Sequence, residues 1–260
     1  MKIEQYLKDC QRTCPSLGSQ ELDLSHMVLG LGSEFLVEYP NAINRADTVN
    51  IGEEIGDLMW YTGNLYKFVG GTTTKEELSV YFGKPIVTSY PEININTYIG
   101  ELCNIVKRFI AYKKEVDEVE VKKFISRVYS AACTLCQNYN IDFELVLENN
   151  INKLKARFPE KFTEERALNR NLQKEYELLS RNMTVEQKTI NPLVKEFTNI
   201  INERTQGECK IRKIYLSKIQ HEDELDISVA FDFEYLDQDY IHNLHTVSEL
   251  NSWLDRVLPS

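Results

Sequence analysis

Three carboxylate residues fall close together in this chain, at Glu53, Glu54 and Asp57. On a helix, Glu54 and Asp57 stand at i and i+3, so both side chains project from one face. No Lys or Arg lies between Arg45 and Lys67 to balance them, and bulky apolar residues follow directly. Crowded carboxylates beside apolar packing raise each other's pKa and destabilise a fold unless a cation neutralises them. The spacing therefore predicts a metal site rather than an ordinary acidic surface.

A second acidic pair lies upstream, where Glu34 and Glu38 stand at i and i+4 among apolar residues. Two helices that each carry such a pair can meet to form a cage of oxygen ligands. Hard divalent ions take these ligands, so Mg2+ is the expected cofactor, with Mn2+ as the alternative. Either pair alone also fits a plain helix surface. Together they predict a metal centre at which Glu34, Glu38, Glu54 and Asp57 act as both ligands and catalytic groups.

A third candidate motif combines one amide with two cations. Asn150, Lys153 and Arg157 stand at i, i+3 and i+7, which places them along one helical stripe. Facing an acidic metal site, such a stripe would hold a polyphosphate, with the metal bridging its oxygens. Taken alone, the same stripe is more typical of an ordinary basic helix face.

The segments that must position these residues are mainly helical up to about residue 180. Beyond the two acidic helices, the pattern predicts helices at about 75–81, 96–114, 118–139 and 142–158, with a loop at 82–91. From residue 183 onward we expect a helix at 192–203, strands at 210–219 and 225–235, a turn at 242–245 and a helix at 247–257. The predicted fold is an all-α helical bundle over residues 1–182, with a small α+β accessory domain of unknown role over 183–260.

Composition narrows the classes of function. The chain has 260 residues, 42% of them hydrophobic, and a formal net charge of -10. Nucleic-acid-binding proteins normally carry a basic surface, so we expect no nucleic-acid partner. No signal peptide and no long apolar run is present, which predicts a soluble cytoplasmic protein without membrane contact. Of the six cysteines, Cys133 and Cys136 form a CxxC pair inside an apolar helical run, and we interpret them as core residues.

The later helices repeat part of the earlier pattern. Placing Val119 under Val49 sets apolar residues under apolar residues, but Phe124 then falls under Glu54 and Arg127 under Asp57. Two interpretations stay open: a degenerate internal repeat with one catalytic and one structural helix pair, or the chance likeness of two amphipathic helices.

The three motifs together resemble the MazG-like all-α nucleoside triphosphate pyrophosphohydrolases, especially the stand-alone forms of phages and bacteria. The matching pieces cover about residues 20 to 170: His26-x-x-x-Gly30-Leu31-x-x-Glu34, then Glu53-Glu54-Ile55-Gly56-Asp57-Leu58-Met59-Trp60-Tyr61, then Asn150-Ile151-x-Lys153-Leu154-x-x-Arg157-Phe158-Pro159-x-x-Phe162. The resemblance implies Mg2+-dependent cleavage of NTP or dNTP to the monophosphate and pyrophosphate. It also implies that Glu34, Glu54 and Asp57 are metal ligands, that Lys153 and Arg157 contact phosphate with Asn150 beside them, and that the chain forms a homo-oligomer, for which we favour a dimer. A phage-encoded protein would work in the host cytoplasm.

One position departs from the family pattern. The family usually carries ExxE on its first acidic helix, but Val37 stands where the second Glu belongs and Glu38 follows one residue later. Either Glu38 substitutes as a ligand or the site has one ligand fewer. The alternative function is therefore a non-catalytic nucleotide-binding or oligomeric interaction protein built on a degenerate site of this type.

Overall fold

The helical part of the protein follows the amphipathic pattern of its sequence. The computed structural model describes residues 1–44, 47–139, 141–160, 162–180, 200–201, 203–204, 210–221, 224–235, 238–244, 252 and 256. The chain divides into two compact units: residues 1–38, 52–137 and 141–182 form the first, and residues 39–51, 138–140 and 183–260 form the second. None of the helices in the described ranges combines the length and apolar character needed to cross a membrane.

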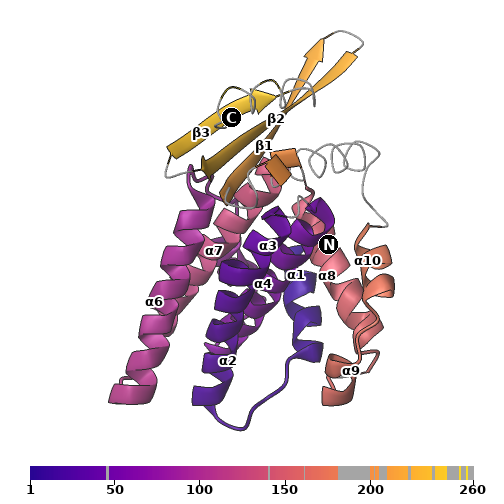
Figure 1. Ribbon diagram of the computed structural model, residues 1–260. Helices are drawn as coiled ribbons and strands as arrows, with labels where there is room; N and C mark the ends of the chain where they lie inside the picture. Colours follow the sequence, from indigo (N-terminus) through magenta and orange to yellow (C-terminus); the bar gives the residue numbers. More distant parts are fainter. Residues whose placement is uncertain are drawn as a thin grey trace. The chain divides into compact units, whose positions relative to one another are not determined.

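The first unit is an all-α helical bundle in which long helices run next to one another (Figure 1). The helices, two of which extend into the second unit, are α1 (Ile3–Asp9), α2 (Gln20–Ser33), α4 (Thr48–Phe68), α5 (Lys75–Tyr81), α6 (Pro91–Tyr112), α7 (Glu118–Asn138), α8 (Phe143–Arg157), α9 (Glu164–Leu168) and α10 (Leu172–Ser180). A 3-10 turn, Cys10–Thr13, follows α1, and a π-helix, Glu34–Glu38, continues α2. The predicted all-α bundle is confirmed at this level.

Helix boundaries follow local capping chemistry. Thr74 caps α5 by accepting a hydrogen bond from the backbone of Glu77 at 3.3 Å, as its position before the helix predicts. Asp142 caps α8 in the same way, accepting from Glu144 at 2.8 Å. The expected start of α6 at Asn96 is wrong, because this helix begins at Pro91. A proline suits the first helical turn, where its missing N–H would have no partner in any case.

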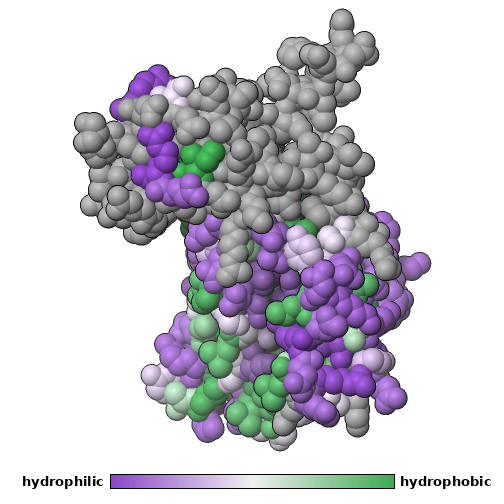
Figure 2. Space-filling view, turned by 45° about the vertical axis from the view of Figure 1, so that its right-hand side comes forward, coloured by the Kyte–Doolittle hydropathy of each residue, from purple (hydrophilic) through white to green (hydrophobic). Residues whose placement is uncertain are grey.

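The core of the bundle is formed by the apolar faces that the periodicity predicts. The side chains buried almost completely include Tyr6, Leu7, Met27, Leu31, Ile55, Leu58, Met59, Ile95, Ile99, Ile125, Val128, Leu135 and Ile151. Cys133 and Cys136 are buried free thiols, which confirms them as core residues. On the face shown in Figure 2, the helical surface is mainly hydrophilic with smaller hydrophobic patches between.

In the second unit, the described residues include α3 (Tyr39–Asn44) and three strands. These are β1 (Lys210–His221), β2 (Glu224–Tyr235) and β3 (Gln238–Leu244). They pair in the antiparallel order β1-β2-β3, with a register shift between Ile211 and Lys213. β1 and β2 lie where two strands were expected. The expected turn at 242–245 is wrong for its described part, because His242 pairs with Phe231 within β3; residue 245 lies outside the described residues.

The remaining C-terminal expectations are not settled by the described residues. Most residues of the two helices expected at 192–203 and 247–257 lie outside the described residues. The division into domains 1–182 and 183–260 stays a prediction, because a compact unit in a structure is not yet a unit that folds alone.

Candidate metal centre

Two glycines let α4 approach its neighbours α2 and α8 closely. A Cβ atom on Gly30 of α2 would lie 2.0 Å from Cε1 of Tyr61 on α4, so a larger side chain does not fit there. Glu34 follows Gly30 by one turn, and Asp57 precedes Tyr61 by one turn. The contact between Gly30 and Tyr61 therefore sets Glu34 opposite the carboxylates of α4.

The second close approach joins α4 to α8. A Cβ atom on Gly56 would lie 3.0 Å from Cβ of Asn150. The hydroxyl of the buried Tyr6 donates to Oδ1 of Asn150 at 2.9 Å and also lies 3.2 Å from the backbone oxygen of Gly56. These contacts fix the Asn150 amide so that its Nδ2 faces Asp57.

The structure brings Glu34, Glu54 and Asp57 to one point. Each offers a carboxylate oxygen, and the three oxygens lie within 4.8 Å of one another, partly open to solvent. At this separation two ionised carboxylates repel by about 3 kcal/mol if the effective dielectric constant is about 20. Lys153 beside Asp57 offsets part of that repulsion, and a proton or a metal ion can relieve the rest. This triad of hard oxygen donors fits a divalent cation.

Burial and mutual repulsion both act on the pKa of two members. Burial, and then the charge of Asp57, raises the pKa of Glu34 to about 7. The same two causes, followed by the charges of Glu53 and Glu34, raise the pKa of Glu54 to about 9. Glu54 therefore keeps a proton at neutral pH in the metal-free protein, and a bound cation would have to displace it.

Asp57 is held by two side chains of α8. Nδ2 of Asn150 donates to Oδ1 of Asp57 at 2.7 Å, and Nζ of Lys153 lies 2.7 and 2.6 Å from the two oxygens. Lys153 also donates to Glu53 at 3.0 Å, and its side chain is only 1% exposed. Burial lowers the pKa of Lys153, but the charges of Asp57 and Glu53 raise it by more. The lysine is thus a buried cation that orients carboxylates, a role that its sequence spacing did not indicate.

Arg157 and Glu38 stand apart from this arrangement. The guanidinium of Arg157 binds both carboxylate oxygens of Glu175, at 3.0 and 2.5 Å. Glu38 has an exposed side chain in the π-helix and lies outside the triad. A π-helix bonds i to i+5 and so holds more residues per turn than an α-helix, which turns Glu38 back toward the direction of an i+3 residue. The predicted ligand role of Glu38 and the predicted phosphate-contact roles of Asn150, Lys153 and Arg157 stay predictions.

The aromatic residues after Asp57 have separate positions. Nε1 of Trp60 donates to the backbone oxygen of Cys10 at 3.0 Å and lies 3.1 Å from Oγ1 of Thr13, so Trp60 is part of the core. Tyr61 is only partly buried, and its ring meets those of His26 and Trp60 edge to face. Of the two aromatic residues, Tyr61 is the one beside the triad that is open to a ligand.

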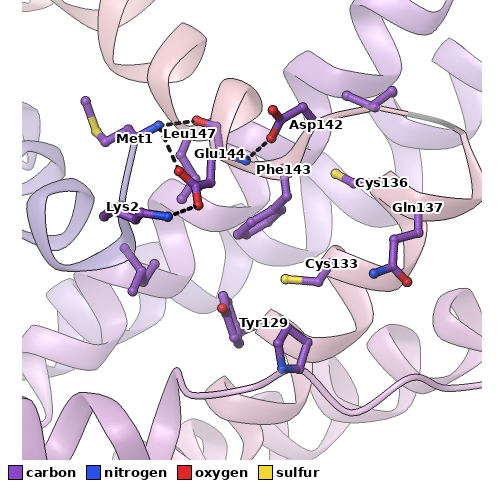
Figure 3. Close-up of a pocket in the computed structure, with 13 residues that line it drawn as sticks. Met1, Lys2, Tyr129, Cys133, Cys136, Gln137, Asp142, Phe143, Glu144 and Leu147 are labelled. Atoms are coloured by element: carbon purple, nitrogen blue, oxygen red, sulfur yellow. Dashed lines mark hydrogen bonds and ion pairs between the residues drawn. The ribbon is translucent and has the colours of Figure 1, made fainter.

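A pocket of about 380 Å³ lies elsewhere in the bundle, between α7 and the start of α8 (Figure 3). Its walls include Tyr129 and Cys133 from α7 and Phe143 from α8, while Glu144 binds Lys2 at its edge. Burial raises the pKa of the Cys133 thiol to about 12, so this thiol is neutral and a poor metal ligand at physiological pH. None of the predicted site residues lines this pocket.

Comparison of the chain with protein-family models, with curated proteins and with solved structures found no match.

Proposed function

We propose that this protein is a Mg2+-dependent nucleoside triphosphate pyrophosphohydrolase of the MazG-like type. One observation carries the proposal: Glu34, Glu54 and Asp57, which come from two separate sequence motifs, place their oxygens within 4.8 Å of one another. The third motif supports it, because Asn150 and Lys153 both bind Asp57. Three motifs that are far apart in the sequence thus meet at one centre.

The division of work among the residues follows from their contacts. Glu34, Glu54 and Asp57 would hold the metal, which when bound polarises phosphate oxygens and lowers the pKa of water. Lys153 and Asn150 keep the Asp57 carboxylate in one orientation. Metal binding then costs less conformational entropy, because this ligand is already ordered. Water attacks one of the two phosphorus atoms joined by the α–β bridging oxygen, the bond from that phosphorus to the bridging oxygen breaks, and monophosphate and pyrophosphate leave. The candidates for the base that takes the water proton are Glu34, Glu38 and Glu54.

A second candidate function is a non-catalytic nucleotide-binding or oligomeric interaction protein. It is favoured by the exposed position of Glu38 outside the triad and by the pairing of Arg157 with Glu175. A centre with three carboxylates and an engaged arginine would bind a metal nucleotide without turning it over.

Incubation with a panel of NTPs and dNTPs separates these functions. The proposed enzyme releases monophosphate and pyrophosphate in equal amounts from at least one member of the panel, and only when Mg2+ or Mn2+ is present. Glu54→Gln serves as the matched control, since it keeps the shape of the side chain but loses the charge. Absence of both products across the panel rejects the enzymatic function.

We also propose that the chain forms a homodimer. Leu22, Leu29 and Leu36 recur every seven residues along α2 and the π-helix, and each is at least half exposed. Exposed leucines gathered along one element offer an apolar surface on which a second chain can pack. Light scattering at micromolar concentration tests it, and a monomeric mass contradicts it.

A further inference from the structure

The cations near the triad differ in how deeply they are buried and in how many protein carboxylates they bind. Lys153 is 1% exposed and is surrounded by Asp57 and Glu53, so its ammonium group has no open side. Arg157 is 15% exposed and binds Glu175 through two nitrogens. Lys153 cannot reach a substrate phosphate without giving up a buried ion pair, which is costly. Arg157 keeps spare N–H donors but has little open surface.

Arg170 is placed differently. It lies between α9 and α10, and its side chain is 39% exposed. Its Nε and Nη2 both donate to one oxygen of Glu175, at 3.3 and 2.8 Å. Nη2 also lies 3.7 Å from Oε1 of Glu53, which is an ion pair at a distance too long for a hydrogen bond. A guanidinium has five N–H donors, so this one retains donors for a further acceptor.

The segment that carries Arg170 is anchored at both ends. Asn169 closes α9 by donating from Nδ2 to the backbone oxygen of Glu165 at 2.9 Å. Asn171 opens α10 by accepting at Oδ1 from the backbone of Lys174 at 3.0 Å. Arg170 therefore projects from a fixed backbone and lies next to Glu53. Glu53 directly precedes Glu54, a member of the triad.

Resting on the function proposed above, we infer that Arg170 binds the phosphate chain of the substrate. Glu175 holds the guanidinium by one edge, and Arg157 on the other side of Glu175 keeps that carboxylate ionised and in place. The long contact with Glu53 is exchanged for phosphate oxygens, which a guanidinium fork binds with paired hydrogen bonds.

Binding of inorganic tripolyphosphate in the presence of Mg2+ tests this inference without requiring turnover. Calorimetric titration of the wild-type chain should show binding, and Arg170→Ala should weaken it about tenfold or more. Arg170→Lys should fall between, because it keeps the charge but loses the fork. The matched control is Lys174→Ala, an exposed cation four residues away, which should stay within about twofold of wild type.

The outcomes separate the inference from the function on which it rests. If the wild-type chain hydrolyses a nucleotide but Arg170→Ala leaves both the tripolyphosphate affinity and the KM unchanged, the inference is overturned and the function stands. If no nucleotide is hydrolysed but tripolyphosphate binding depends on Arg170, the function fails and the binding site stands. Equal thermal stability of Arg170→Ala and wild type shows that lost affinity does not come from unfolding. A wild-type chain that binds no tripolyphosphate also overturns the inference.

Discussion

Helices α4 and α7 of the bundle bury apolar residues at matching positions but carry different polar residues. In α4 the buried residues Ile55, Leu58 and Leu65 match Ile125, Val128 and Leu135 of α7, which are equally buried. Where α4 carries Glu54 and Asp57, α7 carries Phe124 and Arg127. The guanidinium of Arg127 lies 5.6 Å from the centre of the Tyr98 ring of α6 and 5.9 Å from that of Phe124. Helix α4 thus carries carboxylates at the positions where α7 has Phe124 and an arginine close to two aromatic rings.

The difference teaches which features are needed for folding and which are not. A cation over aromatic rings is mildly stabilising. In α4 the ion pair with Lys153 offsets the charge of Asp57, whereas Glu34 and Glu54, which are partly buried close to Asp57, are destabilised in their charged forms. The α6 and α7 pair of the same bundle packs without carboxylates at the corresponding positions. The crowding of Glu34 and Glu54 beside Asp57 is therefore best explained by a bound ligand.

The largest expected effect comes from replacing the carboxylate that Lys153 holds. Asp57→Asn should abolish nucleotide hydrolysis and lower the free energy of unfolding of the metal-free protein by about 3 kcal/mol, because it leaves a buried ammonium with one partner fewer. Arg127→Ala, the matched change in α7, should cost less than about 1 kcal/mol and leave turnover intact. Urea denaturation with a chelator, combined with the nucleotide assay, measures both. Equal losses in the two variants would remove the contrast between the two helices.

The close approach of α2 and α4 depends on the missing side chain of Gly30, so Gly30→Ala should create a clash. The new Cβ would lie 2.0 Å from Cε1 of Tyr61, so either the Tyr61 ring or the two helices must shift, at a cost of about 1–3 kcal/mol and with a reduced affinity for Mg2+. The control is Gly100→Ala in α6, where the added Cβ meets open space and alanine should stabilise the helix by up to about 1 kcal/mol. Thermal melts of both variants should therefore shift in opposite directions. A shift of Gly30→Ala to higher temperature would contradict the described packing.

Glu54→Gln should abolish turnover but stabilise the metal-free protein. Burial and Asp57 raise the pKa of Glu54 to about 9, above its ordinary value near 4.5. Since the unfolded chain loses this proton first, the stability of the metal-free wild type falls as pH rises from about 5 to 9. The glutamine removes the part of that slope that belongs to Glu54, and the melting temperature at pH 8 should rise by a few degrees, on the order of 2–4 °C. Thermal melts with a chelator at several pH values test this. If the melting temperature of Glu54→Gln changes with pH as much as that of wild type, the pKa of Glu54 is not raised.

The smallest effect is expected at Glu38. Because its side chain is exposed and lies outside the triad, Glu38→Ala should change the free energy of unfolding by no more than about 0.5 kcal/mol. The Mg2+ concentration for half-maximal activity should also stay close to that of wild type, while Glu34→Ala should raise it strongly. If Glu38→Ala damages metal activation as much as Glu34→Ala, Glu38 is a fourth ligand.

The sequence predicts much of the helical fold, because the apolar periodicity and capping residues that set α5, α7 and α8 are local. It also predicts the triad, since the spacing of Glu54 and Asp57 fixes a shared face whatever packs against it. It does not predict the π-helix at Glu34–Glu38, for which these residues carry no local signal. Nor does it predict that Lys153 is buried or that Glu175 binds Arg157, because both depend on contacts between segments distant in the chain.

Direct titration of Mg2+ into the metal-free protein tests the central claim, that Glu34, Glu54 and Asp57 hold a divalent cation. Calorimetry at pH 7 in two buffers with different ionisation enthalpies also counts the protons released. The account predicts binding that releases protons, because Glu54 is protonated in the metal-free state, and predicts that Glu54→Gln binds far more weakly. Absence of binding, or equal binding by wild type and Glu54→Gln, would contradict it.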